Sequence, residues 1–322
     1  MPYLRYKFFI LIFLICLSLP AFAESSQQGS SSVAWWVWPL SLLIVSFLIG
    51  IVGVLGGVGG GVLFVPIVSG FYPFHLDFVR GAGLLIALAG ALAASPKLLR
   101  IGMADLRLVM PLAFIASIAS IGGAIVGLAI PANFVQIALG VAILGIVFLI
   151  YRSKESEYPK VAKPDALSTS LRIFGVYDDP AAGKDIHWKI HRTKPALFIF
   201  IGIGFLAGLF GLGAGWANVP VLNLVMGAPL KLSVASSKFL LTVVDTSAVW
   251  VYINQGAVLA MIAVPSVIGV MLGSLIGVRL LTITKSKNIR IIIIVLLSLA
   301  GMRSLLKGLE IWLWICRYVK NN

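Results

Sequence analysis

The chain has 322 residues, of which 60% are hydrophobic, and a mean hydropathy of +1.06. Only 11% are charged, against about 25% in a soluble domain, so the composition excludes a soluble globular protein. The formal net charge is +14, but the basic residues lie mostly between apolar stretches, as in cytoplasmic loops of membrane proteins. We therefore expect the chain to be embedded in the lipid bilayer and not to bind nucleic acid. The long apolar stretches favour membrane-spanning helices over a β-barrel.

The first residues have the pattern of a secretory signal. Arg5 and Lys7 precede an apolar run, and the sequence Ala-Phe-Ala predicts cleavage after Ala23. The alternative is an uncleaved first helix, and either reading places the following residues outside the cytoplasm. Because Cys16 would leave with the signal, Cys316 would have no partner in the mature chain, so we expect no disulfide and no cysteine metal site.

Ten apolar segments follow, five on each side of a polar stretch. They cover residues 34–56, 60–72, 80–96, 108–130, 133–151, 195–211, 214–227, 232–252, 257–281 and 289–306. The prediction is an all-α polytopic bundle. Its parts are a signal peptide (1–23), a first transmembrane repeat (34–152), a cytoplasmic polar loop (153–194), a second transmembrane repeat (195–308) and an interfacial tail (309–322).

The two repeats share an unusual glycine pattern. The stretch GVLGGVGGGVLFVPIV begins at residue 53, and GLFGLGAGWANVPVL begins at residue 208. A shift of 154 positions superimposes the glycines and prolines of the first stretch on those of the second: Gly57, Gly59, Gly61 and Pro66 on Gly211, Gly213, Gly215 and Pro220. Matches in this order predict two homologous halves.

The loop charges predict that the halves are inverted. The connection at 97–107 carries three basic residues and its counterpart near 251–260 carries none, while the connection at 279–290 carries four and its counterpart near 129–136 carries none. If basic loops stay in the cytoplasm, equivalent loops lie on opposite sides. Five crossings per half fit this, provided the chain doubles back at the glycines. The mature N-terminus is then outside and the 153–194 loop inside.

A chain that turns inside a membrane must satisfy its backbone groups within protein or a wet cavity. Glycine permits positive φ and close backbone approach, and the following helix would offer free N–H groups to an anion. The alternative is close helix packing through small residues. Pro66 and Pro220 would mark a kink or a second break. Neither stretch continues as a nucleotide-binding loop, so we expect no cofactor.

The pattern G-x-G-x-G-x-x-x-V-P occurs in both halves, at 57–66 and 211–220, and a small-residue GAG or SSK segment follows it. With these features and a central polar loop, the chain resembles the sulfite exporter TauE/SafE family. The resemblance covers roughly 45–150 and 195–305. It implies an inner-membrane permease for sulfite, sulfonates or related sulfur anions, usually an exporter.

Ionisable residues at membrane depth are expensive, so each is a candidate site. Lys238 and Arg80 could attract an oxyanion, or their side chains could extend to the membrane surface. Asp245, seven residues after Lys238 on one helix face, could couple transport to a proton or another ion, or could hydrogen-bond between helices. The candidate substrate-binding set is completed by polar residues of the second half and by the glycines: Ser236, Ser237, Asn218, Gly57, Gly59, Gly61, Gly211, Gly213 and Gly215.

The expected function is therefore secondary transport of a small anion, without enzymatic activity, by alternating access of two inverted repeats. No catalytic constellation is visible in the sequence. The rival functions are an anion channel, a permease for another small anion, and a membrane assembly factor that transports nothing. The sequence leaves the coupling ion, the direction of transport and homo-oligomerisation open.

Overall fold

The computed structural model describes residues 36–55, 59–100, 102–152, 159, 161, 163–179, 184–283, 294–295, 297–299, 301–302, 304–306 and 308–309. The predicted signal, most of the predicted tail and Gly57 lie outside them. The helices and strands in chain order are α2 (Val37–Leu55), α3 (Gly60–Phe71), α4 (Leu76–Arg100), α5 (Leu106–Ala129), α6 (Ala132–Arg152), α7 (Ala166–Ser170), β1 (Phe174–Asp179), β2 (Lys184–Lys189), α8 (Thr193–Phe210), α9 (Gly215–Pro220), η1 (Val221–Val225), α10 (Leu230–Asn254) and α11 (Ala260–Ile283).

Six helices in the described part of the chain are long and apolar enough to cross a membrane: α2, α4, α5, α8, α10 and α11. The segments after the glycine stretches are short, as predicted. Helix α3 has 12 residues, which at ~1.5 Å each cannot span a hydrocarbon core of ~30 Å. Helix α9 has 6 residues and continues into the π-helical turn η1. The prediction of a polytopic helical membrane protein is confirmed.

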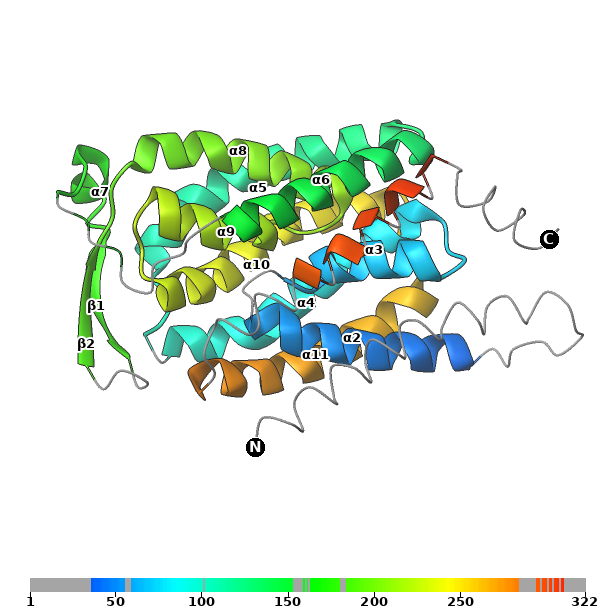
Figure 1. The fold of residues 1–322 in the computed structure, drawn as a ribbon, viewed down its shortest axis with the longest axis horizontal. Helices are drawn as coiled ribbons and strands as arrows, with labels where there is room; N and C mark the ends of the chain where they lie inside the picture. Colours follow the sequence, from blue (N-terminus) through cyan, green and yellow to red (C-terminus); the bar gives the residue numbers. More distant parts are fainter. Residues whose placement is uncertain are drawn as a thin grey trace, which may run out of the picture.

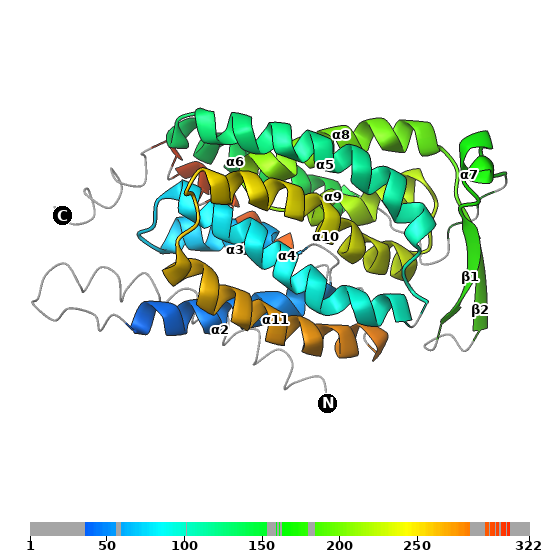
Figure 2. The same cartoon turned by 180° about the vertical axis from the view of Figure 1, so that it is seen from behind.

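The long helices form a layered bundle (Figures 1 and 2). Packing contacts connect them in the order α2, α11, α4, α10, α5, α8, with α3 on α4 and α9 on α10. Helices α4 and α10 run in opposite directions: Gly81, near the start of α4, lies against Ala257, just beyond the end of α10. The counterparts in the two halves are α2 and α8, α4 and α10, and α5 and α11. If each helix is replaced by its counterpart, the same order of contacts results, read in the reverse direction.

Small residues bring the outer helix pairs into backbone contact. A Cβ atom on Gly273 of α11 would clash with the backbone of Phe47 on α2, and one on Gly123 of α5 would clash with the backbone of Phe205 on α8. Such close approach stabilises helix pairs in lipid through dispersion, because lipid tails supply no hydrophobic driving force between helices. The two pairs therefore use equivalent glycines in the same way.

The chain leaves helical geometry at both glycine stretches. In the second half α8 ends at Phe210, and the φ angles of Gly211 and Gly213 are 67° and 74° before α9 begins. In the first half Gly59, the equivalent of Gly213, has a φ of 85° and immediately precedes α3. Side chains rarely adopt this region of φ, so glycine is required there. We call Gly59 the first break and residues 211–214 the second break.

The prolines behave differently in the two halves. Pro66 lies inside α3, which continues to Phe71. Pro220 is the last residue of α9, and the π-helical turn follows it directly. Because a proline inside a helix removes a backbone hydrogen bond, a change of helix type at Pro220 is physically reasonable.

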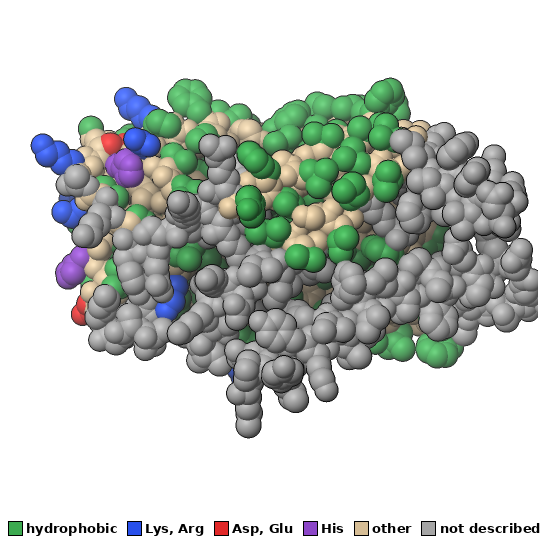
Figure 3. Space-filling view, in the orientation of Figure 1, with side chains coloured by type: hydrophobic (Ala, Val, Ile, Leu, Met, Phe, Trp, Pro, Cys, Tyr) green, Lys and Arg blue, Asp and Glu red, His purple; other side chains and the backbone are tan. Residues whose placement is uncertain are grey.

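The polar loop folds at one end of the bundle, where β1 and β2 pair antiparallel and α7 lies beside them (Figure 1). The Asp165 carboxylate accepts hydrogen bonds from the backbone N–H and the hydroxyl of Thr193, at 3.2 and 2.9 Å. This side chain therefore fastens the loop to the first residue of α8. In Figure 3 the Lys, Arg and His side chains on this face gather at the hairpin end, and hydrophobic side chains are abundant over the part of the bundle that is not drawn in grey.

Candidate functional site

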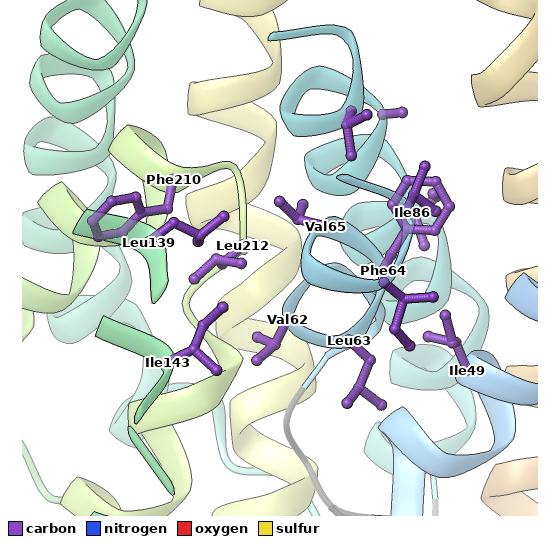
Figure 4. Packing of buried hydrophobic residues seen from close by; sticks show 14 of the residues in the cluster. Ile49, Val62, Leu63, Phe64, Val65, Ile86, Leu139, Ile143, Phe210 and Leu212 are labelled. Atoms are coloured by element: carbon purple, nitrogen blue, oxygen red, sulfur yellow. The ribbon is translucent and has the colours of Figure 1, made fainter. Parts of the chain in front are cut away.

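Each break lies against the start of the helix that follows the other break. A Cβ atom on Gly61 would lie 2.6 Å from the carbonyl oxygen of Leu212, in the second break. A Cβ atom on Gly59 would lie 3.9 Å from the Cα atom of Gly215. Figure 4 shows Val62 and Val65 of α3 pointing toward Leu212, so apolar side chains surround this junction. Glycines 154 residues apart thus contribute to one place.

Helix α10 passes both breaks with a single face. The ammonium group of Lys238 donates a hydrogen bond of 2.7 Å to the carbonyl oxygen of Gly53, and the backbone N–H of Gly59 donates to the same oxygen at 3.4 Å. Two turns further along α10, Asp245 lies beside Gly213, where a Cβ atom would be 2.8 Å from a carboxylate oxygen. One helix therefore carries a cation to the first break and an anion to the second.

The Asp245 carboxylate is fully buried, and neither of its oxygens has a hydrogen-bond partner among the described residues. The backbone N–H of Ala214 interacts with the carboxylate without meeting hydrogen-bond geometry. Lys238 attracts it electrostatically but forms no salt bridge with it. Since nearly all buried polar atoms in proteins have partners, a carboxylate of this kind is a strong indication of a functional group.

Asn218, on α9, is a second buried polar group of this kind. Its exposed fraction is 0%, and neither its amide nitrogen nor its amide oxygen has a partner among the described residues. Three positions before it, Gly215 meets the first break, and residues three apart share a helix face. The indole nitrogen of Trp216 in the same helix is also buried without a partner in the described chain.

The two serines before Lys238 are buried on α10. The hydroxyl of Ser236 accepts a hydrogen bond of 3.3 Å from the backbone N–H of Asp105, which caps the start of α5. This contact directs Ser236 toward α5. Ser237 also has an interaction within the protein.

Arg80 is fully buried, and protein groups surround its guanidinium. It donates to the Asp77 carboxylate at 2.8 Å, to the carbonyl oxygen of Gly127 at 3.1 Å, and to that of Leu209. It also lies over the ring of Tyr252, 5.5 Å from its centroid. These contacts hold together the start of α4 and the ends of α5, α8 and α10. Arg80 and Lys238 each reach a last-turn carbonyl of the first helix of the other half.

All the described candidate residues are buried. A substrate that binds between the breaks would therefore have to enter and leave through a change of conformation, because none of the candidate residues that the structure describes reaches the surface. This burial also makes each polar contact at the junction stronger than it would be in water.

Sequence reasoning did not find several contributors to the junction. Gly53 supplies the carbonyl oxygen that accepts the hydrogen bond from Lys238. Gly83 allows the backbone of Gly211 to approach closely, because a Cβ atom on residue 83 would lie 2.6 Å from the carbonyl oxygen of Gly211. Both belong to glycine-rich segments, which is the signal that could have found them. Tyr252 carried no such signal, and Trp216 lies within the second glycine stretch but was passed over because aromatic residues are ordinary in apolar segments.

The sequence of the chain is similar to those of known membrane transporter proteins. The family model for sulfite exporter TauE/SafE proteins matches residues 42–304. The chain is 23% identical over 283 residues to Probable membrane transporter protein MJ0441 of Methanocaldococcus jannaschii, covering 82% of this chain and 94% of that protein. It is 24% identical over 275 residues to Probable membrane transporter protein YunE of Bacillus subtilis, covering 83% and 97%. No solved structure matches the chain.

Proposed function

The chain belongs to the sulfite exporter TauE/SafE family, and from this premise we propose that it is a secondary transporter that exports small sulfur-containing anions, such as sulfite or organosulfonates. Membership in a family of membrane transporters, together with six described helices that are long and apolar enough to cross a membrane, supports a multi-pass membrane transporter rather than an enzyme. The observation that carries the proposed site is the meeting of two glycine breaks around buried polar groups that lack partners in the described chain.

The proposed mechanism is alternating access by two inverted halves, 34–152 and 195–308. Three features support inversion: the symmetric order of helix contacts, the antiparallel arrangement of α4 and α10, and the reciprocal reach of Arg80 and Lys238. In inverted-repeat transporters the substrate site lies near the midplane, where interrupted helices of the two halves meet. Movement of one half against the other would open the junction to one side at a time.

The proposed location is the inner membrane, with the mature N-terminus outside and the 153–194 loop in the cytoplasm. The basic side chains of the loop, of the end of α4 and of the start of α5 support this orientation, since cytoplasmic loops are rich in Lys and Arg. The tail beyond 308 is proposed as an interfacial segment. A homo-oligomer is compatible with the apolar outer faces of the bundle.

The proposed substrate site lies between the two breaks. Lys238 would attract the anion, Asn218 would donate from its amide, and Asp245 would couple the movement to an ion. The remaining groups are backbone N–H donors and hydroxyls: Gly57, Gly59, Gly61, Gly211, Gly213, Gly215, Ser236 and Ser237. Arg80 would act through the helix ends that it holds, with Pro66 and Pro220 shaping the segments after the breaks.

A flux assay with a panel of anions tests this function. Purified protein in liposomes should accelerate the movement of labelled sulfite or methanesulfonate, and the rate should saturate with concentration because each transport cycle needs a change of conformation. Sulfate, chloride and taurine in the same assay define selectivity, and liposomes without protein give the background. A flux that rises with anion concentration without saturating would indicate a channel. Flux at the background level for every anion would contradict transport and favour a role in membrane assembly.

A further inference from the structure

Two charged residues at the breaks, Lys238 and Asp245, belong to no salt bridge among the described residues, and both come from the second half. On α10, Lys238 lies at the first break and Asp245 at the second, with Leu241 between them packed against Gly59. The corresponding face of α4 carries Gly83, Ile86 and Gly90, which are neutral. The junction therefore contains one cation and one anion, and its formal charge is zero when both are ionised.

Other charged groups do not change this sum. The elements packed against α10 are α4, α5, α8, α9 and η1, and the last two carry no charged residue. The other charged residues of these elements and of α10 lie near helix ends and are exposed or half-buried: Lys97, Arg100, Asp105, Arg107, Arg192, Lys194 and Lys231. Arg80 is paired with Asp77. Lys238 is the charge that acts on the Asp245 carboxylate.

A monovalent anion that entered this buried junction alone would leave one uncompensated negative charge. Burying an unpaired charge in a protein costs several kcal/mol. One proton on Asp245 restores neutrality, since the cation of Lys238 then balances the anion. The protonated carboxyl group also gains a donor, which can be directed to an anion oxygen and gives the carboxyl the hydrogen-bond partner it lacks among the described residues.

We propose that Asp245 takes up one proton with each monovalent anion, so that the loaded junction is neutral and transport is electroneutral. The proton moves from water to an Asp245 oxygen as the anion binds beside Lys238, and both return to water on the other side. This inference rests on the proposed function, because it requires an anion to occupy the junction.

Replacing the carboxylate with an amide removes the negative charge from the junction and leaves the positive one. In Asp245→Asn the junction carries only the cation of Lys238, so a monovalent anion neutralises it without a proton. The variant should bind the anion with no proton uptake, and its transport should respond to membrane potential and ignore a pH gradient. The wild-type protein should show the reverse.

Calorimetry measures the proton directly. Methanesulfonate is titrated into detergent-solubilised protein in two buffers that differ in ionisation enthalpy, and the difference in heat gives the protons bound per anion. We expect about one proton for the wild-type protein and for Asp245→Glu, and about none for Asp245→Asn. Asp185→Asn, which removes an exposed acid on β2, should keep the wild-type value.

The outcomes separate this inference from the function beneath it. If methanesulfonate, sulfite and the other anions of the panel all fail to bind the wild-type protein, the proposed function fails. If an anion binds the wild-type protein without a proton, the function stands and the inference is wrong. If Asp245→Asn still takes up one proton, another group carries it. Should Asp245→Asn fail to fold, the wild-type count decides the stoichiometry alone.

Discussion

The Lys238→Ala variant should lose about 10- to 100-fold in anion transport, because a hydrogen bond to a charged group is worth about 1.5–3 kcal/mol. Lys238 is the cation at the junction, with an exposed fraction of 2% and a hydrogen bond of 2.7 Å to Gly53. Without it, Asp245 would remain as an unbalanced negative charge that repels the anion. The measurement is the initial rate of labelled sulfite flux in liposomes.

Two variants make the Lys238 result specific. Lys97→Ala removes an exposed cation near the end of α4 and should leave flux unchanged. Lys238→Arg keeps the charge but changes its shape and hydrogen-bonding geometry, so it should retain part of the flux. Wild-type flux in Lys238→Ala would remove this residue from the site.

The Gly213→Ala variant should both stop transport and destabilise the protein, whereas Gly256→Ala should only destabilise it slightly. Both glycines have positive φ, 74° and 67°, so alanine costs about 1–2 kcal/mol at either position. At Gly213 the added Cβ would also lie 2.8 Å from Asp245, while at Gly256 nothing lies within 4 Å. Overpacking adds about 1–3 kcal/mol at the former.

Thermal unfolding in detergent and flux in liposomes measure these two effects separately. Gly213→Ala should have the lower unfolding temperature, and its folded fraction should still be inactive because the added methyl group disturbs the carboxylate at the break. Gly256→Ala should transport at the wild-type rate. Equal unfolding temperatures for the two variants would show that the second break is not closely packed against Asp245.

The sequence was most informative where a residue type is locally unsuited to its setting. Glycines in an apolar segment predicted breaks, and the positive φ angles of Gly59 and Gly213 confirm that the chain turns there. In the same way, Lys238 and Asp245 stood out because charges at membrane depth are expensive. Both signals are local and need no knowledge of the packing.

Pairings between distant segments could not be predicted. Lys238 meets Gly53, which is 185 residues away, and Arg80 meets Leu209, which is 129 residues away. These contacts depend on how the helices pack, and apolar helices of similar composition give little indication of which neighbour they choose. For the same reason the sequence could not indicate that Asn218 and Trp216 would be buried without partners among the described residues.

Side-selective labelling of equivalent positions tests inversion, on which the account of the junction depends. Arg100, in the last turn of α4, and Asn254, in the last turn of α10, are both exposed and are related by the 154-residue shift. Single cysteines are placed at each position in a chain whose Cys16 and Cys316 are replaced by serine, and an impermeant thiol reagent is applied to intact cells. We predict that the cysteine at 254 reacts from outside and the one at 100 only after the cells are opened. Reaction of both from the same side would contradict the inverted arrangement.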